Sequence, residues 1–217
     1  MAQQILVSKA QGVAHIRFNR PDKKNSLTDE MYLALISAVD QAAALPEVKV
    51  LLFSGEQAVF TAGNDLDDFI NRPPKDGNAP VFTLLRKLVD IDKPVMAAVQ
   101  GLAIGIGTTL LLHCDLVYAA QDTKFALPFV NLGLVPEAAS SLLLAQLAGH
   151  QRAAEKLLFG DPFTAVEAME LGFVNRLLPT EEVVDFALRQ AQRLATLPAG
   201  AVVGTKRLMR TQERRRQ

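Results

Sequence analysis

The sequence DKPVMAAVQGLAIGIG, residues 92–107, decides the fold, because it joins a predicted buried strand to a turn that contains three glycines. The apolar run Val95–Gln100 predicts the strand, and Thr108–His113 predicts a helix directly after the turn. The glycine spacing differs from a dinucleotide-binding fingerprint, and the Gly-Lys-Ser/Thr ending of a phosphate-binding loop is missing. The turn still places unpaired backbone N–H groups at the start of a helix, where they can face negative charge.

A second segment of this kind is FTAGNDLDDF, residues 60–69, between the predicted strand Val48–Phe53 and a short predicted helix, Leu66–Ile70. Its small residues would let the backbone approach a ligand closely. The alternative is that Asn64 or Asp65 simply caps the helix. Two such turns, each offering one N–H, can together form an oxyanion hole for a thioester carbonyl. Each donor in such a hole is worth about 3–4 kcal/mol.

Along the whole chain, predicted strands and helices alternate up to about residue 150, and amphipathic helices dominate from Gln151 onward. This order predicts an α+β fold built from β-β-α units. Residues 71–80 form a predicted polar loop. The first two predicted strands, Ile5–Val7 and Val13–Phe18, alternate like the two strands of a hairpin around Gly12. The other predicted strands are Val48–Phe53, Val95–Gln100, Asp115–Ala119, Lys124–Leu127 and Val174–Leu178. One predicted helix opens at Thr28, and the others cover Leu66–Ile70, Val81–Val89, Thr108–His113, Leu142–Leu147, Ala153–Phe159, Ala165–Leu171, Glu181–Leu197 and Val202–Met209.

Composition excludes several classes of protein. Lys+Arg and Asp+Glu both number 23 in 217 residues, so no global field recruits nucleic acid or an anionic membrane. The lone Cys114 excludes an internal disulfide and, among leucines, indicates a buried small hydrophobe. The three histidines lack metal-ligand spacing, and the acids at 65, 67 and 68 are typical of a solvated helix turn, so we expect no metal. Without a signal sequence or a long apolar run, we expect a cytoplasmic protein.

From about Ile16 onward, the chain resembles the enoyl-CoA hydratase/isomerase (crotonase) family. The motifs that carry the resemblance are RFNRPDKKNSL (17–27), FTAGNDL (60–66), DKPVMAAVQGLAIGIG (92–107), CDLVYAA (114–120) and FALPFVNLGLVPEAASS (125–141). The resemblance implies an acyl-CoA thioester as substrate, with no cofactor beyond the coenzyme A that the substrate itself carries. It implies that the amides of Asn64 and Ile106 form the oxyanion hole. The implied substrate-binding residues are Lys24, Ala62, Gly63, Asn64, Asp65, Leu66, Gly105, Phe129 and Leu134.

The same resemblance implies a spiral of β-β-α repeats over residues 1–150 and a helical trimerisation region over residues 151–217. The implied assembly is a homotrimer or a dimer of trimers. Family members usually continue for a few tens of residues beyond the position of Gln217, so we expect the helical region to be incomplete.

The choice between activities depends on carboxylates. Hydratases of this family carry two glutamates, and Thr109 and Phe129 stand at those positions here. Hydration needs a base for water and an acid for the α-carbon, so a conventional hydratase is disfavoured. Glu137, in a Pro-Glu turn, and the Gly-Asn-Asp-Leu loop resemble the peroxisomal-type Δ3,Δ2-enoyl-CoA isomerases, in which one carboxylate moves the proton. We expect Phe129, Leu132 and Leu134 to form an apolar wall that keeps the pKa of Glu137 from falling too low.

Three alternatives stay open at this point. Pro136 and Glu137 are also a good helix opening, with proline at the first position and an acid in the first turn. The chain could instead be a non-catalytic acyl-CoA-binding module that uses the same pocket. It could also catalyse another reaction of the family that needs the same oxyanion hole, such as thioester hydrolysis.

Overall fold

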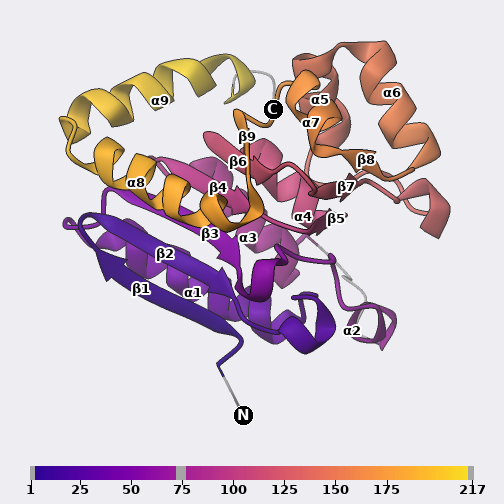
Figure 1. Cartoon of the computed structure of the whole chain (residues 1–217), viewed down its shortest axis with the longest axis horizontal. Coiled ribbons are helices and arrows are strands. Elements are labelled where there is room, and N and C mark those ends of the chain that lie inside the picture. The colour runs from indigo at the N-terminus through magenta and orange to yellow at the C-terminus, as the bar shows by residue number, and fades with distance from the viewer. Residues whose placement is uncertain (1–2, 72–76, 215–217) are drawn as a thin grey trace.

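The computed structural model describes residues 3–71 and 77–214, so part of the predicted loop 71–80 lies outside the described residues. The largest element is a six-stranded sheet in the order β1-β2-β3-β4-β6-β9 (Figure 1). Its first two strands form the predicted antiparallel hairpin, and every later pairing is parallel. The strands are β1 Ile5–Ala10, β2 Val13–Phe18, β3 Val50–Gly55, β4 Val95–Val99, β6 Leu116–Ala120 and β9 Arg176–Leu178.

A smaller sheet has the order β5-β7-β8, with β5 Leu102–Ile104, β7 Lys124–Ala126 and β8 Phe163–Thr164. Each pass of the chain places one strand in the large sheet and the next in the small sheet: β4 is followed by β5, and β6 by β7. The segment after β3 follows the same alternation, because Thr61 forms an isolated bridge with Ala103 in β5 of the small sheet. The repetition of β-β-α units expected from the sequence is therefore confirmed. The sequence does not predict β5 and β8, because strands of three and two residues show no alternation.

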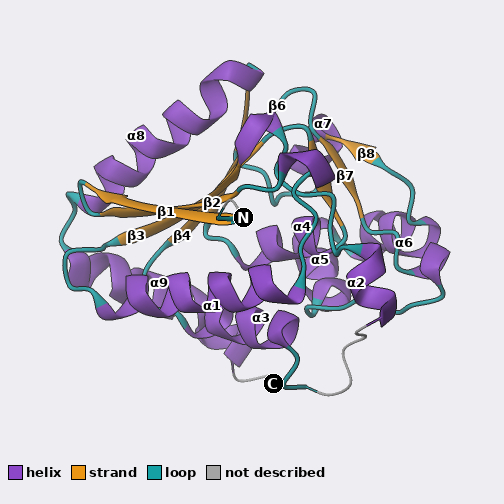
Figure 2. Ribbon diagram, turned by 90° about the horizontal axis from the view of Figure 1, so that it is seen from below, coloured by secondary structure: helices purple, strands orange, loops and turns teal. Residues whose placement is uncertain are grey.

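Helices cover both faces of the large sheet (Figure 2). Helix α8 packs on one face over Val50, Leu52 and Met96, and α1 and α3 lie on the other face over the larger core. The α1 helix begins after Thr28, whose Oγ1 accepts a hydrogen bond from the Met31 N–H, as the sequence predicts. The helices are α1 Asp29–Ala44, α2 Leu66–Asn71, α3 Pro80–Asp90, α4 Ile106–Thr109, α5 Ser140–Ala148, α6 His150–Phe159, α7 Ala165–Glu170, α8 Val183–Ala195 and α9 Ala199–Arg214.

The expected division at residue 150 does not separate two hydrophobic cores. Strand β9 pairs with β6 in the large sheet, and β8 pairs with β7 in the small one. Phe163 stacks against Phe125, with the ring centroids 5.8 Å apart. Residue 150 therefore marks a change in helix content, and the later elements complete sheets that earlier strands begin.

Helix α9 docks mainly through charge. The buried Lys206 Nζ lies 2.7 Å from Asp115 Oδ2 and donates to the Lys93 carbonyl at 2.7 Å, and Arg210 lies 3.3 Å from the other oxygen of Asp115. Asp115 Oδ2 also accepts the Val95 N–H at 2.7 Å. This network joins α9 to the starts of β4 and β6. Within residues 3–71 and 77–214, no helix is long and apolar enough to cross a membrane.

Candidate active site

The two glycine-bearing segments of the sequence lie side by side, joined through Thr61. The Thr61 N–H donates to the Leu102 carbonyl at 2.9 Å, and the Ile104 N–H donates to the Thr61 carbonyl at 3.1 Å. On its other side, the 60–66 loop is bound to residues 24–27. The Ala62 N–H donates to the Lys24 carbonyl at 3.0 Å, and Leu27 exchanges two 2.8 Å bonds with Gly63 and Asp65. Backbone hydrogen bonds from two directions thus fix this loop.

Two glycines permit the close approach of these segments. Gly63 has φ +94°, and a Cβ there would lie 2.8 Å from the Ile104 carbonyl oxygen. Gly107 faces Thr61, whose Cγ2 would lie 2.7 Å from an added Cβ. Real Cβ atoms do not approach other atoms this closely, so any side chain would push the two segments apart. The glycines are needed for packing between two backbones, as the sequence suggests.

The amides of Asn64 and Ile106 stand out in this region. The N–H groups of Thr61, Ala62, Gly63 and Asp65 all donate within the chain. In the described part of the chain, the Asn64 N–H has no acceptor, and neither does the N–H of Ile106, the first residue of α4. The structure therefore places two unpaired donors on two adjacent segments. Such a pair can accept a developing oxyanion.

Glu137 lies in the loop before α5. The helix begins only at Ser140, and Ala138 and Ala139 have left-handed conformations with φ +57° and +52°. The alternative that Glu137 is an acid in the first helical turn is therefore wrong. His113 Nε2 donates to the Ala138 carbonyl at 2.9 Å, and Ser140 Oγ donates to the Glu137 carbonyl at 2.6 Å. Consecutive left-handed non-glycine residues are strained, and they persist here because these contacts hold the turn.

The Glu137 carboxyl is half-buried, and its Oε1 atom is buried without a hydrogen-bond partner in the described residues. Burial raises the pKa of this carboxyl above its ordinary value of 4.5, because desolvation disfavours the charged form. Of the predicted apolar wall, Phe129 is buried, but Leu132 and Leu134 are 58% and 40% exposed. The wall is thus only partly formed within one chain, because residues 131–135 lie at the surface.

Asp65 has a structural position. Its Oδ2 accepts from Arg20 at 2.6 Å and from Ser26 Oγ at 3.3 Å, and its Oδ1 accepts the Asp68 N–H at 3.1 Å. Asp65 therefore caps α2, which was one of the two sequence alternatives. The bond from Arg20 lowers the pKa of Asp65, which keeps the carboxyl charged. Because these contacts occupy both carboxyl oxygens, the expectation that Asp65 binds substrate has no support from its side chain.

Other predicted site residues are placed as follows. Lys24 is exposed and left-handed at φ +51°, and Leu66 is exposed at the start of α2. Gly105 is partly exposed immediately before Ile106. Thr109 is fully buried and donates to the Ile106 carbonyl at 3.4 Å. Cys114 is partly rather than fully buried, and burial raises the pKa of its thiol.

The sequence analysis missed two residues that organise the site. Asn25 is buried, accepts from the Arg20 N–H at 2.7 Å and donates to the Val59 carbonyl at 2.6 Å. Tyr32 is 3% exposed, and its hydroxyl donates a short hydrogen bond to Asn64 Oδ1. Asn25 lies inside the quoted motif 17–27, which could have identified it. Tyr32 gives no such signal, because it reads as an ordinary core position of an amphipathic helix.

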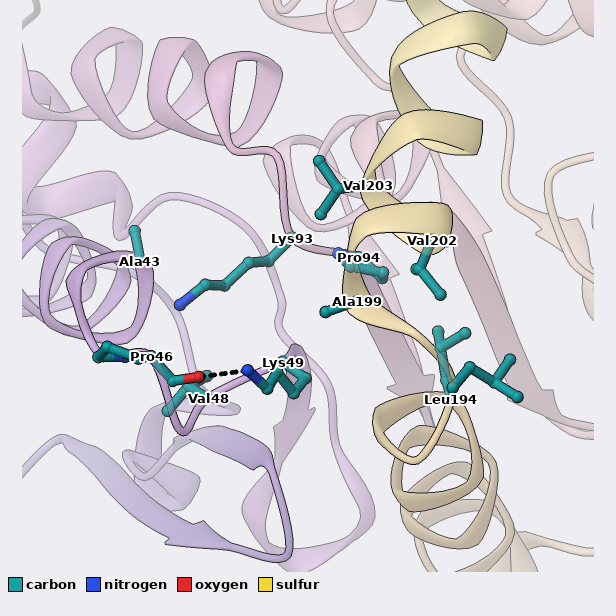
Figure 3. Close-up of a pocket in the computed structure, with 11 residues that line it drawn as sticks. Ala43, Pro46, Val48, Lys49, Lys93, Pro94, Leu194, Ala199, Val202 and Val203 are labelled. Carbon is teal, nitrogen blue, oxygen red and sulfur yellow. Dashed lines mark hydrogen bonds between the residues drawn. The ribbon is translucent and has the colours of Figure 1, made fainter.

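A pocket with a volume of about 250 Å³ lies between the end of α1 and the start of α9, away from the candidate site residues (Figure 3). Its two lysines are occupied: Lys93 donates to the Ala42 and Leu45 carbonyls at 2.7 Å, and Lys49 donates to Pro46. This pocket contains none of the predicted site residues. Among residues 3–71 and 77–214, no three His, Cys, Asp or Glu side chains could hold a metal ion together.

Comparison with known proteins shows the family and the fold of the chain. Residues 8–217 match the family model described as enoyl-CoA hydratase/isomerase. This chain is 34% identical to enoyl-CoA delta isomerase 2 of Rattus norvegicus over 97% of its own length. It spans only 55% of the length of that relative. The 1,2-epoxyphenylacetyl-CoA isomerase of Escherichia coli is 36% identical, over 91% of this chain and 78% of the relative. An enoyl-CoA hydratase/isomerase structure from Pseudoalteromonas atlantica superposes with a TM-score of 0.92 at 39% identity, over 96% of this chain and 83% of that one. The expected fold is confirmed.

Proposed function

The chain belongs to the enoyl-CoA hydratase/isomerase family, and from that membership we propose that it is an acyl-CoA enzyme, specifically a Δ3,Δ2-enoyl-CoA isomerase. One observation carries the proposal: the half-buried carboxyl of Glu137 has a buried oxygen without a hydrogen-bond partner in the described residues. The N–H groups of Asn64 and Ile106, which have no acceptor in the described residues, support it. Burial raises the pKa of this carboxyl, which makes it a stronger base than an exposed carboxylate. The two relatives named above are both isomerases by name, which agrees with this choice.

In the proposed reaction, the thioester carbonyl of a 3-enoyl-CoA lies on the N–H groups of Asn64 and Ile106. Glu137 removes a proton from C2, and the electron pair moves into the thioester to give a dienolate. The two amides stabilise the negative oxygen, which carries more charge in the transition state than in the substrate. The same carboxyl then delivers the proton to C4, so the double bond moves to C2–C3 and Glu137 is charged again.

The environment of the site favours isomerisation over hydration. Thr109 is fully buried and bonded to the Ile106 carbonyl, and its hydroxyl does not ionise near neutral pH. Phe129 is a buried aromatic with no titratable group, so neither residue can serve as a general acid or base. Hydration needs two such groups, whereas the double-bond shift needs one. A purely binding module would have no need of a strained turn that holds a desolvated carboxyl, because the buried charge destabilises the fold.

The test is Glu137→Gln, assayed with a 3-enoyl-CoA by the ultraviolet absorbance of the conjugated 2-enoyl thioester. We expect kcat to fall at least about 100-fold with little change in KM, because glutamine keeps the shape but carries no exchangeable carboxyl proton. Glu170→Gln, at an exposed position on α7, is the matched control and should keep wild-type rates. Isomerisation by Glu137→Gln near the wild-type rate would show that Glu137 is not the base.

The wild type also separates the alternatives. Release of free thiol from an acyl-CoA, followed with a thiol reagent, would indicate hydrolysis. Binding of acyl-CoA without any turnover would indicate a binding module, and conversion of a 2-enoyl-CoA to its 3-hydroxy product would indicate a hydratase. Each of these outcomes would replace the isomerase assignment.

We also propose that the chain assembles as a homotrimer or as a dimer of trimers. Helix α6 exposes Leu158 and Phe159, at 70% and 66%, and neighbouring α7 exposes Val166 and Met169. Apolar side chains gathered on the helices of one region are typical of an interface between copies. Light scattering should give three or six times the chain mass, and charged substitutions at Leu158 and Phe159 should reduce it. A monomer at micromolar concentration would contradict the proposal.

A further inference from the structure

The amino-terminal turn of α1 is fixed to the 60–71 segment by more than packing. Thr28 caps the helix, and the Asp29 N–H donates to Asp68 Oδ2 at 2.7 Å across 39 residues of sequence. Leu27, just before the helix, forms a bridge with Asn64. This arrangement holds Tyr32, in the first turn of α1, at a defined position against the loop that carries the unpaired Asn64 N–H.

The contact of Tyr32 with Asn64 is specific. The phenol ring is buried, and its hydroxyl donates to Oδ1 of the Asn64 side chain. In the described part of the chain, Asn64 Nδ2 donates to no acceptor, so this hydrogen bond alone fixes the side-chain amide of Asn64. Both residues line a small pocket with Leu27, Phe69 and Val81. The hydroxyl therefore contacts the side chain of the residue whose backbone N–H is one of the two candidate donors.

We propose that Tyr32 is a positioning residue, which holds Asn64 through its side chain and thereby sets the direction of the Asn64 backbone N–H toward the substrate carbonyl. This inference rests on the proposed function, because it concerns the same oxyanion-binding pair. Backbone bonds from Gly63 and Asp65 to Leu27 flank Asn64, and Tyr32 adds a third attachment at the residue itself. A donor contributes most to catalysis when it is fixed before the reaction begins.

The surroundings keep Tyr32 in the form that this role needs. Burial, followed by the charges of Glu137 and Asp29, raises the pKa of the Tyr32 phenol well above its ordinary value. The phenol thus remains a neutral donor while Glu137 is charged.

The first experiment is Tyr32→Phe, which removes only the hydroxyl and keeps the buried ring. We expect kcat for 3-enoyl-CoA isomerisation to fall about 10- to 100-fold while KM changes less than about twofold, as for a misplaced catalytic group. Tyr118→Phe is the matched control, because Tyr118 is the only other tyrosine in the sequence, is also buried, and packs against Phe186 beneath α8. Equal kcat values for Tyr32→Phe and Tyr118→Phe would overturn the proposal.

A double-mutant cycle with Asn64→Ala tests whether Tyr32 acts through Asn64. Alanine keeps the backbone N–H but removes the acceptor of the Tyr32 hydroxyl. If Tyr32 acts through that acceptor, adding Tyr32→Phe to Asn64→Ala should reduce kcat no further. Independent, multiplicative losses would overturn the proposal, because they would mean that Tyr32 affects the reaction by another route.

A spectroscopic measurement separates this inference from the proposed reaction. A saturated acyl-CoA with a 13C-labelled thioester carbonyl cannot isomerise, but its C=O stretch moves to lower frequency when two N–H groups polarise it. We expect a clear shift in wild type and in Tyr118→Phe, and a smaller shift in Tyr32→Phe. A wild type that shows the shift but no isomerisation would refute the isomerase assignment and leave the role of Tyr32 supported. An unchanged shift in Tyr32→Phe would overturn that role whatever the activity.

Discussion

Gly63→Ala should impair catalysis far more than it impairs folding, and the structure supplies the size of both effects. The added Cβ would lie 2.8 Å from the Ile104 carbonyl oxygen, whereas ordinary contacts begin at 3.4 Å. Relief therefore requires a displacement of about 0.6 Å between the two segments that carry the unpaired amides. A misplacement of about 1 Å costs about 100-fold in rate, so 0.6 Å should cost kcat about 10- to 20-fold.

Stability provides the internal comparison. Gly63 has φ +94° and Gly172 has φ +91°, so alanine at either position suffers the same dihedral strain of about 1–3 kcal/mol. A Cβ at Gly172 would meet only the Leu147 carbonyl oxygen, at an ordinary 3.9 Å. Gly172→Ala is thus a control that contains the strain without the displacement.

The assay measures melting temperature and isomerisation kcat for both variants. We expect both to melt several degrees below wild type, at about 2–4 °C per kcal/mol for a chain of this length. Only Gly63→Ala should lose kcat, with Gly172→Ala within about twofold of wild type. If Gly63→Ala keeps wild-type kcat, or if both variants lose activity equally, the close contact of the two segments does not set the positions of the donors.

Two further predictions concern buried charge. Because burial raises the folded-state pKa of Glu137 above 4.5, its charged form destabilises the fold at higher pH, so Glu137→Gln should melt above wild type at pH 7. This advantage should disappear as pH falls toward 4.5 in a series of thermal melts, and a wild type more stable at every pH would refute it. Asp115→Ala leaves the buried Lys206 without its carboxylate and should cost about 3–5 kcal/mol in urea denaturation. Asp92→Ala, which breaks the exposed pair with Arg207, should cost much less, and equal losses would contradict the argument.

Local sequence signals predicted most of the fold. The Thr28 cap, the β1–β2 hairpin around Gly12 and the strand that leads into the turn 101–107 all depend on residues close in sequence. The short strands β5 and β8 could not be predicted in this way, because they exist only through pairing with β7. The left-handed pair Ala138 and Ala139 was also invisible, since alanine favours helices and gives no sign of a strained turn.

The residues of the candidate site also differ in whether the sequence alone can identify them. The glycine pattern indicates the two turns that contain Asn64 and Ile106, but the assignment of these two amides, like that of Glu137, comes from the family resemblance. Tyr32 could not be identified from the sequence, because its meaning depends on a hydrogen bond that spans 32 residues. The exposure of Leu132 and Leu134 could not be predicted either, because it depends on the path of the whole chain and not on the two side chains themselves.

The attachment of α9 has a consequence for how the folded protein opens. Over residues 199–210, the only fully buried side chain is that of Lys206, which ends in a charged ammonium group. Detachment of this helix therefore exposes little additional apolar surface to water. Coulombic gain and desolvation nearly cancel in a buried ion pair. Helix α9 should therefore open as a separate cooperative unit, with amide protons that exchange long before those of β3 and β4. The exchange rate of the α9 amides should rise with salt concentration, because salt weakens the ion pairs that hold the helix.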